Sequence, residues 1–314
     1  MEQKKKMPLN TIIGVLLKST KLVKMLKAVK VIKSAKYLVT AFTMLLSALV
    51  YGWRFGFWFG AGLVALIFIH EMGHVWAMKR KGYPTSAPIF IPLLGAVIFA
   101  PPMDDRDDES YIGFGGPFIG SLGALVMWGL WYILPSHPTL LLLLSYFGIY
   151  INLFNLLPIR PLDGGRILQS VGPWVKWIGL VMLCVVLYMM QHPGLLLIFM
   201  LSIDDFVPNR KTRFRYLAVI FVLMMVGYII GPGFIMEFWV DLPLGLLLLG
   251  MAYGSYRMRL KKGEDFVEVV SDARPYPSID IKRKWLVRYF LLLISLIVLI
   301  VIMHAQIEPL LPKK

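Results

Sequence analysis

Long apolar runs, separated by short polar or basic segments, dominate the pattern of the chain. Several of these runs reach the roughly 20 residues that an α-helix needs to cross a hydrocarbon core about 30 Å thick. The pattern predicts spans near residues 37–53, 55–78, 112–134 and 140–157, followed by apolar blocks at 174–190, 194–207, 216–230, 238–256 and 285–304. We therefore predict an all-α polytopic membrane protein with about nine transmembrane helices.

The apolar segment 87–101 departs from this pattern, because it is too short to cross a bilayer as a helix. Pro92 and Gly95 interrupt it, and apolar positions alternate around them. Two short strands joined by a turn fit this arrangement better than a helix does. We expect a small re-entrant, β-hairpin-like segment, with a loop that only packs at the membrane interface as the alternative.

Composition and charge support a membrane location. The chain has 314 residues, of which 58% are hydrophobic and 16% are charged, and its formal net charge is +15. In a soluble protein such an excess of basic residues would suggest nucleic acid. Here the cations lie between apolar runs, where they orient a membrane protein with its positive segments in the cytoplasm. We expect the lipid bilayer as a partner and no nucleic acid.

The same basic residues predict the orientation of the chain. Lys79, Arg80 and Lys81 follow the second span, which places that end in the cytoplasm and, one span earlier, the N-terminus as well. The block 194–207 has only 14 residues, and if it does not cross, every later span reverses. This topology fits the plasma membrane of a bacterium or an archaeon.

A candidate metal site lies inside the second span, in the sequence His70-Glu71-Met72-Gly73-His74. Histidines four residues apart share one face of a helix, so that both imidazoles can bind one Zn²⁺ while Glu71 takes a proton from a water on the metal. A short pattern of this kind also arises by chance. Charged side chains inside a spanning helix cost at least about 2.5–3.5 kcal/mol, however, which favours a site with a compensating partner.

The third ligand that a catalytic zinc site needs is predicted after the fourth span. Pro158 and Pro161 end that helix, and Asp163 follows on an unwound segment at the same side of the membrane as the histidines. A carboxylate at that depth is costly unless a metal or another cation compensates it. We predict Asp163 as a zinc ligand, with a helix cap or an ion pair with Arg160 or Arg166 as the alternative.

Four motifs resemble the site-2 protease family of intramembrane zinc metalloproteases: HEMGH at 70–74, FIPLLGA at 90–96, GGPFIG at 115–120 and NLLPIRPLDGG at 155–165. The resemblance implies one Zn²⁺ per chain, with His70, His74 and Asp163 as its ligands. It also implies Glu71 as the catalytic base and Asn155 as a polar group beside the substrate carbonyl.

The resemblance further implies a reaction and a class of substrates. Members of this family cut peptide bonds within or beside transmembrane segments, so that single-pass membrane proteins are the expected substrates. The hairpin would bind an unwound substrate by strand addition. The predicted substrate-binding residues are Phe90, Ile91, Gly95 and Ala96 in the hairpin and Asn152 in the fourth span.

These motifs divide the chain into four parts. Residues 1–36, in which lysine recurs at every third position from 18 to 36, are expected to form a basic segment, either a cytoplasmic tail or a segment that lies on the cytoplasmic membrane surface. Residues 37–170 form the catalytic membrane core, 171–304 form additional transmembrane helices of unknown role, and 305–314 form a C-terminal tail. The acidic run at 104–109 is expected to be solvated, with a contact to a basic partner as the alternative.

Two other functions would also fit a polar cluster inside a membrane. A non-catalytic membrane scaffold could bind or sequester membrane proteins, but it would most simply have lost Glu71 or a ligand, and all of these residues are present. A metal or solute transporter would need polar residues along both halves of a path, and the sequence shows none toward the outer side. Proteolysis is the function that the sequence favours.

Overall fold

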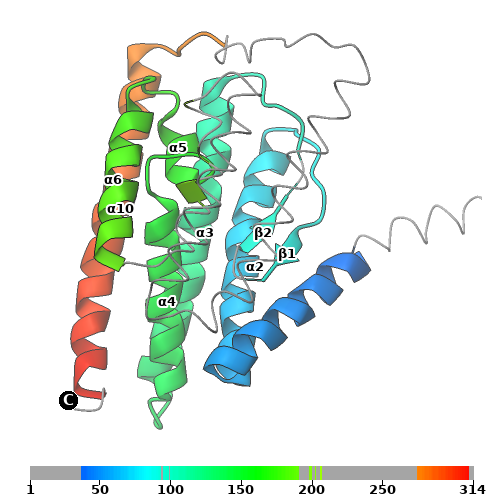
Figure 1. The fold of residues 1–314 in the computed structure, drawn as a ribbon, viewed down its shortest axis with the longest axis vertical. Helices are drawn as coiled ribbons and strands as arrows, with labels where there is room; N and C mark the ends of the chain where they lie inside the picture. Colours follow the sequence, from blue (N-terminus) through cyan, green and yellow to red (C-terminus); the bar gives the residue numbers. More distant parts are fainter. Residues whose placement is uncertain are drawn as a thin grey trace, which may run out of the picture.

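The computed structural model describes residues 37–92, 95–98, 100–190, 198–199, 202, 206 and 274–310. This part of the chain is a bundle of helices with one small hairpin beside it (Figure 1). The helices are an N-terminal helix at Tyr37–Phe55, α2 at Phe57–Arg80, α3 at Arg106–Ile133, α4 at Thr139–Asn155, α5 at Asp163–Leu168, α6 at Val175–Met190 and α10 at Ile279–Ile307. The strands are β1 at Ile89–Ile91 and β2 at Gly95–Val97, and a 3-10 turn, η2, follows α10 at Glu308–Leu310.

Among the described residues, four helices are long and apolar enough to cross a membrane, namely the N-terminal helix, α2, α3 and α10. The helices α4 and α6 are apolar but shorter. The mostly helical membrane fold with a small hairpin is therefore confirmed. The blocks expected at 216–230 and 238–256, and most of 194–207, lie outside the described residues, so that the total of about nine spans stays a prediction.

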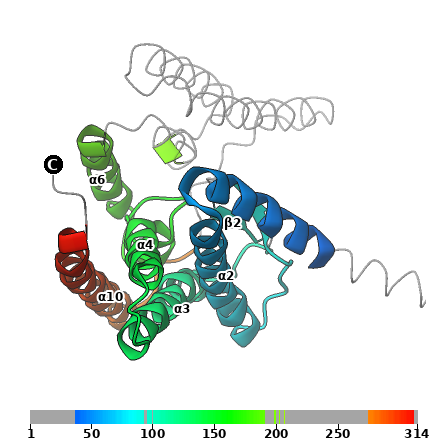
Figure 2. The same cartoon turned by 90° about the horizontal axis from the view of Figure 1, so that it is seen from below.

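Glycine residues determine the turn and the close contact between the N-terminal helix and α2. Gly56 lies between them with a φ of 93°, in the left-handed region that glycine adopts without steric cost. One turn later, a Cβ on Gly60 would lie 2.4 Å from the backbone nitrogen of Gly52, so that the two helices touch backbone to backbone. The N-terminal helix then tilts away from α2 (Figures 1 and 2). Only 11% of the 18-residue apolar stretch of the N-terminal helix is buried, which leaves most of its surface for lipid.

The helices α2 and α3 also meet through glycine. A Cβ on Gly73 would lie 2.2 Å from the carbonyl oxygen of Gly115, and a Cβ on Gly115 would lie 2.6 Å from that of Gly73. Small residues allow this close approach of two helices inside a membrane. Because Gly73 lies between the two histidines of the HExxH motif, the contact brings the backbone of α3 against the candidate metal site.

The hairpin forms where the alternating pattern predicted it. Its strands are antiparallel, with Ile89 opposite Val97, Phe90 opposite Ala96 and Ile91 opposite Gly95. The side chain of Phe90 is 3% exposed and packs in a cluster with Leu63 and Val64 of α2. The hairpin therefore lies against the middle of α2, beside the N-terminal helix (Figure 1).

The expectation of a solvated acidic run was wrong. Helix α3 begins at Arg106, so that residues 106–109 of the run form its first turn, where negative charge is favourable, and Asp105 caps the helix by accepting from the Asp108 N–H. Three carboxylates in this turn form ion pairs with other segments: Asp107 with Lys284, Asp108 with Lys81, and Glu109 with Arg160 and Arg274. The charges are paired because the fold brings basic residues from three separate segments to this end of the bundle.

The C-terminal helix α10 packs into the same core as the helices around the HExxH motif. Trp285, Tyr289 and Leu296 of α10 are each at most 3% exposed. They share one hydrophobic cluster with Leu156 and Ile167, which lie on either side of Asp163. A division of the chain after residue 170 therefore does not separate α10 from the core.

Candidate metal centre

The three predicted ligands converge in the interior of the bundle. His70 and His74 come from adjacent turns of α2, and Asp163 is the first residue of α5 rather than part of an unwound segment. All three are buried. The Nε2 atoms of the two histidines lie 3.2 Å apart, and Asp163 places one carboxylate oxygen 3.1 Å from His70 Nε2 and the other 3.2 Å from His74 Nε2.

These distances suit zinc. In a tetrahedral site with bonds of about 2.0 Å, two ligand atoms lie about 3.3 Å apart. Two imidazole nitrogens and a carboxylate oxygen are also ligands that Zn²⁺ accepts, and three protein ligands leave the fourth position open for water or substrate. Within the described residues this is the one group of three or more potential ligands that could hold a metal ion.

The ion pairs offered as alternatives for Asp163 do not replace this arrangement. Arg166 lies near the carboxylate, with Nη1 3.8 Å from Oδ1, but both histidine nitrogens are closer. Arg160 forms an ion pair with Glu109. Arg166 thus adds positive charge beside Asp163, while the histidines remain its nearest polar neighbours.

Hydrogen bonds to the second ring nitrogen orient both histidines. His70 Nδ1 donates to Oδ1 of Asn152 at 2.8 Å, and His74 Nδ1 donates to the carbonyl oxygen of Ile112 at 2.8 Å. With the proton held at Nδ1, each ring presents the lone pair of Nε2 to the site. The chain therefore selects the tautomer that binds a metal through Nε2.

The side chain of Asn152, in α4, contacts one of the predicted zinc ligands. Its side chain is 3% exposed, accepts from His70 and donates through Nδ2 to the carbonyl oxygen of Gly148 at 2.7 Å. Both ends of the amide are thus engaged with the protein, and the contact with His70 makes Asn152 a positioning residue. The available signal was an asparagine in an otherwise apolar span, which must find a polar partner.

Glycine residues bring the backbone of α3 into contact with the ligand side chains; we call this surface the α3 wall. A Cβ on Gly116 would lie 2.2 Å from His74 Nε2 and 2.8 Å from His70 Nε2, and a Cβ on Gly120 would lie 2.5 Å from Asn152 Oδ1. Both glycines belong to the motif GGPFIG. Its direct contact with the ligand atoms was not foreseen, because the sequence does not show which face of α3 meets α2.

The turn that carries Asp163 is also folded through glycine. A Cβ on Gly164 would lie 2.1 Å from the carbonyl oxygen of Leu156, and a Cβ on Gly165 would lie 2.4 Å from the carbonyl carbon of Ile159. Helix α5 thus packs directly on the chain that precedes it. Side chains at these two positions would push Asp163 away from the histidines.

Glu71 and Asn155 are the two predicted catalytic residues. Glu71 is buried and follows the ligand His70 directly on α2. Asn155 is the last residue of α4, is half-buried, and donates through Nδ2 to the carbonyl oxygen of Ile151 at 3.1 Å. The catalytic roles of both residues remain predictions.

The model of peptidase family M50 matches residues 58–138. Residues 58–138 resemble the M50 peptidases. The M50 segment contains the HExxH motif, the hairpin and all of α3, which confirms the resemblance to site-2 proteases. Asp163 and Asn152 lie beyond the matched residues, and the fold brings them to the M50 segment.

One curated relative of the chain is named as a zinc metalloprotease. The zinc metalloprotease MJ0392 of Methanocaldococcus jannaschii is 32% identical over 122 residues. The alignment covers 36% of this chain and 35% of the relative, so that the chain spans about a third of the length of the protein it matches. The likeness to this zinc metalloprotease therefore covers about a third of each chain.

The contact between Asn152 and His70 can be tested through metal affinity. Replacing Asn152 by leucine removes the acceptor that holds His70 Nδ1, and we expect the zinc dissociation constant to rise about 10- to 100-fold. Competition with a chromogenic chelator measures this change. Asn155→Leu, one turn later on α4, is the matched control and should leave zinc affinity unchanged. Equal effects of the two substitutions would contradict the assignment.

Proposed function

We propose that the chain is an intramembrane zinc metalloprotease that hydrolyses peptide bonds within or next to the transmembrane segments of single-pass membrane proteins. The observation that carries the proposal is the convergence of His70, His74 and Asp163, with Nε2 and carboxylate oxygens 3.1–3.2 Å apart, inside a helical membrane bundle. The resemblance of residues 58–138 to the M50 peptidases supports it. One zinc ion per chain is expected, because one such group is present among the described residues.

The metal and the residues around it would each have a separate role in the reaction. Zinc, when bound, would polarise the scissile carbonyl and lower the pKa of a water molecule. Glu71 would accept a proton from the attacking water on its carboxylate and pass it to the departing amine. The Asn155 amide has a second N–H besides the one donated to Ile151, and this N–H would stabilise negative charge on the carbonyl oxygen.

The distribution of charge supports a cytoplasmic position of the site. Lys81 follows α2 and Lys284 lies near the start of α10, yet both form ion pairs with the first turn of α3. The basic residues of these segments therefore gather at one end of the bundle, the end expected in the cytoplasm. His70 and His74 lie nine and five residues before Lys79, about 7–14 Å from that end at about 1.5 Å per residue. Water would enter from this side.

The location follows from the same argument. We place the protein in the plasma membrane of a bacterium or an archaeon, with the N-terminus in the cytoplasm and about nine spans in the whole chain. The apolar helices of the described residues support a multi-pass protein. Labelling of single cysteines with a membrane-impermeant reagent would test this orientation, because residues beside Lys79 should react only after the membrane is opened.

The hairpin offers one free edge to an unwound substrate. The Phe90 N–H donates to Thr43 Oγ1 of the N-terminal helix at 3.1 Å, so that the outer edge of β1 is covered at this position. In an antiparallel ladder, its partner Ala96 then directs its own N–H and carbonyl away from β1. Neither group of Ala96 has a hydrogen-bond partner among the described residues. Strand addition would therefore take place on β2.

This assignment distinguishes among the predicted substrate-binding residues. Gly95 and Ala96 belong to the free strand, whereas Phe90 has its side chain in the core and its N–H bonded to Thr43. Ile91 lies opposite Gly95 at the end of the hairpin. The backbone of β2 is thus the surface on which we expect a substrate strand to bind.

Substitution of Ala96 by proline tests whether a substrate strand pairs with β2. Proline removes the N–H that would donate to the substrate, and the loss of one hydrogen bond should lower kcat/KM about 3- to 10-fold while zinc content is unchanged. Ala96→Gly keeps the N–H and is the control. If Ala96→Pro cleaves as fast as the glycine variant, the substrate does not pair with β2.

The proposed function itself is tested by cleavage of a panel of tagged single-pass membrane proteins. The purified full chain, in liposomes, should cut at least one of them, should lose this activity in a zinc chelator and should regain it when zinc is added. Metal analysis of the same preparation should give about one zinc per chain. Bound zinc without cleavage of any panel member would favour the alternative, a non-catalytic scaffold that binds membrane proteins.

A further inference from the structure

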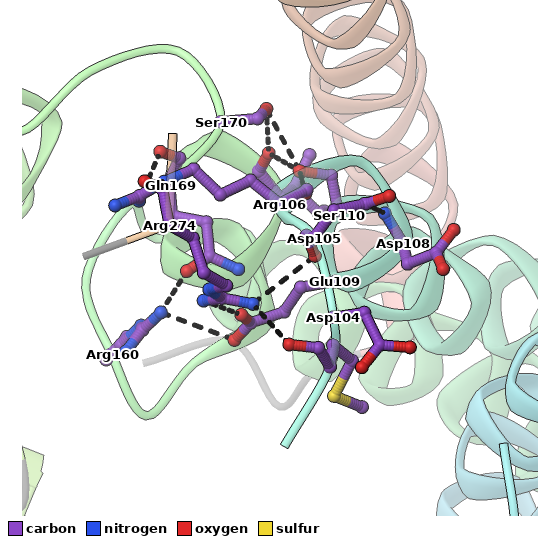
Figure 3. A network of polar contacts seen from close by, with 12 residues as sticks. Asp104, Asp105, Arg106, Asp108, Glu109, Ser110, Arg160, Gln169, Ser170 and Arg274 are labelled. Atoms are coloured by element: carbon purple, nitrogen blue, oxygen red, sulfur yellow. Dashed lines mark hydrogen bonds and ion pairs between the residues drawn. The ribbon is translucent and has the colours of Figure 1, made fainter. Parts of the chain in front are cut away.

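Glu109, in the first turns of α3, joins two arginines from distant parts of the chain. Its Oε2 lies 2.6 Å from Nη2 of Arg274, just before α10, and its Oε1 lies 3.3 Å from Nη2 of Arg160, in the turn before α5 (Figure 3). The Glu109 side chain is 13% exposed. One carboxylate thus ties the start of α3 to the segment that carries Asp163 and to the C-terminal helix. We call this contact the Glu109 bridge.

A second set of contacts links the same three segments. Arg106 is 5% exposed and donates from Nε to the Arg274 carbonyl at 3.1 Å and from Nη1 to the Gln169 carbonyl at 3.2 Å. Its guanidinium also lies 4.2 Å from the centre of the Tyr276 ring. Arg160 and Gln169 lie on either side of Asp163 in the sequence, so that the segment with the zinc ligand is anchored at both of its ends.

Helix α10 contributes a third anchor from inside the core. The hydroxyl of Tyr289 donates to the carbonyl oxygen of Leu156 at 2.6 Å, and Tyr289 is 3% exposed. The same Leu156 carbonyl is the atom against which Gly164 packs. Tyr289 therefore fixes the surface on which the residue next to Asp163 rests.

We propose that the Glu109 bridge and Tyr289 are positioning elements that hold Asp163 at the metal, and that α10 is thereby a working part of the metal centre. The inference rests on the proposed function for its consequence in catalysis, but its first consequence is for zinc binding. A ligand on a turn must be ordered before it can bind, and contacts that order it in advance raise the affinity for the metal. These contacts come from residues outside the M50 segment as well as from Glu109 within it.

The test measures the zinc dissociation constant of the full chain by competition with a chromogenic chelator. Glu109→Gln and Tyr289→Phe should each weaken zinc binding about 10-fold or more. Lys284→Gln is the control for the bridge, because it removes an ion pair with Asp107 in the same turn of α3. Tyr132→Phe is the control for Tyr289, because its hydroxyl accepts from Gln306 of α10 at the opposite end of the bundle. Both controls should bind zinc as the unchanged chain does.

Further measurements separate positioning from general stability. Glu109→Gln combined with Arg160→Gln should weaken zinc binding by less than the product of the two separate effects, because the two residues share one contact. At saturating zinc, kcat of Glu109→Gln should return to within about threefold of the unchanged chain. Should Glu109→Gln fail to fold, Arg160→Lys and Tyr289→Phe supply the same comparison.

The outcomes distinguish this inference from the proposed function. Unchanged zinc affinity in Glu109→Gln and Tyr289→Phe, or equal losses in the controls, would overturn the positioning role while cleavage by the unchanged chain persists. Weakened zinc binding in a chain that cleaves no substrate would support the positioning role and contradict the protease.

Discussion

Glu71→Gln is expected to lower kcat for any substrate about 10²- to 10⁴-fold while the protein still binds about one zinc ion. Glutamine has nearly the same shape as glutamate but cannot accept a proton, which removes the general base that we assign to this position. The ligands His70, His74 and Asp163 contact one another through atoms that the substitution does not touch. Zinc content and cleavage rate, measured on the same preparation, check the result.

A matched control separates the chemistry from the loss of a negative charge. Glu308→Gln makes the same substitution in the exposed 3-10 turn after α10, far along the chain from the metal centre. It should cleave as the unchanged chain does. If the Glu71 variant retains full activity, the general base lies elsewhere, whereas loss of zinc together with cleavage would make Glu71 a residue of the metal site rather than the base.

Gly116→Ala is expected to weaken zinc binding about 100-fold or more and to abolish cleavage at ordinary zinc concentrations. The added methyl group would lie 2.2 Å from His74 Nε2 and 2.8 Å from His70 Nε2, in contact with both donor atoms. These atoms are the far ends of two side chains. The rings can rotate away to relieve the contact, so that the fold survives, but the nitrogens then leave the positions that a metal requires.

The control for Gly116→Ala lies on the same helix. Gly129→Ala places a methyl group where no atom lies within 4 Å, and alanine favours a helix over glycine. Zinc affinity and the Tm in the presence of chelator should match the unchanged chain for Gly129→Ala. For Gly116→Ala the Tm in chelator should also be close to that value, with the stabilisation by added zinc lost. Zinc bound at full affinity by Gly116→Ala would contradict the geometry of the α3 wall.

Local sequence patterns were sufficient to predict two of the three metal ligands. His70 and His74 could be placed on one face of a helix because a spacing of four residues within one helix has a single geometric meaning. The hairpin was predictable for a similar reason, since its alternation and its turn residues are all contained within residues 87–101. Asp163 required one further step, because proline and the cost of a buried charge had to be combined with the side of the membrane.

Other features depended on partners that the sequence does not identify. Asp107 and Glu109 are ordinary acidic residues of a loop until Lys284 and Arg274, more than a hundred residues later, are brought beside them. Asn152 could be recognised as a polar group in need of a partner, but its contact with His70 depends on how α2 and α4 pack.

The sequence by itself determined the membrane class, the helical positions of the spans that the structure describes, the hairpin and the chemical nature of the metal ligands. Each of these follows from neighbours in the chain, because periodicity, span length and side-chain chemistry are local. Only the tertiary structure decided that α3 presents Gly116 to the ligand atoms and that α10 packs beside the turn carrying Asp163. The physical reason is that these contacts are set by which helix faces meet, and the choice of faces is made by packing across the whole bundle.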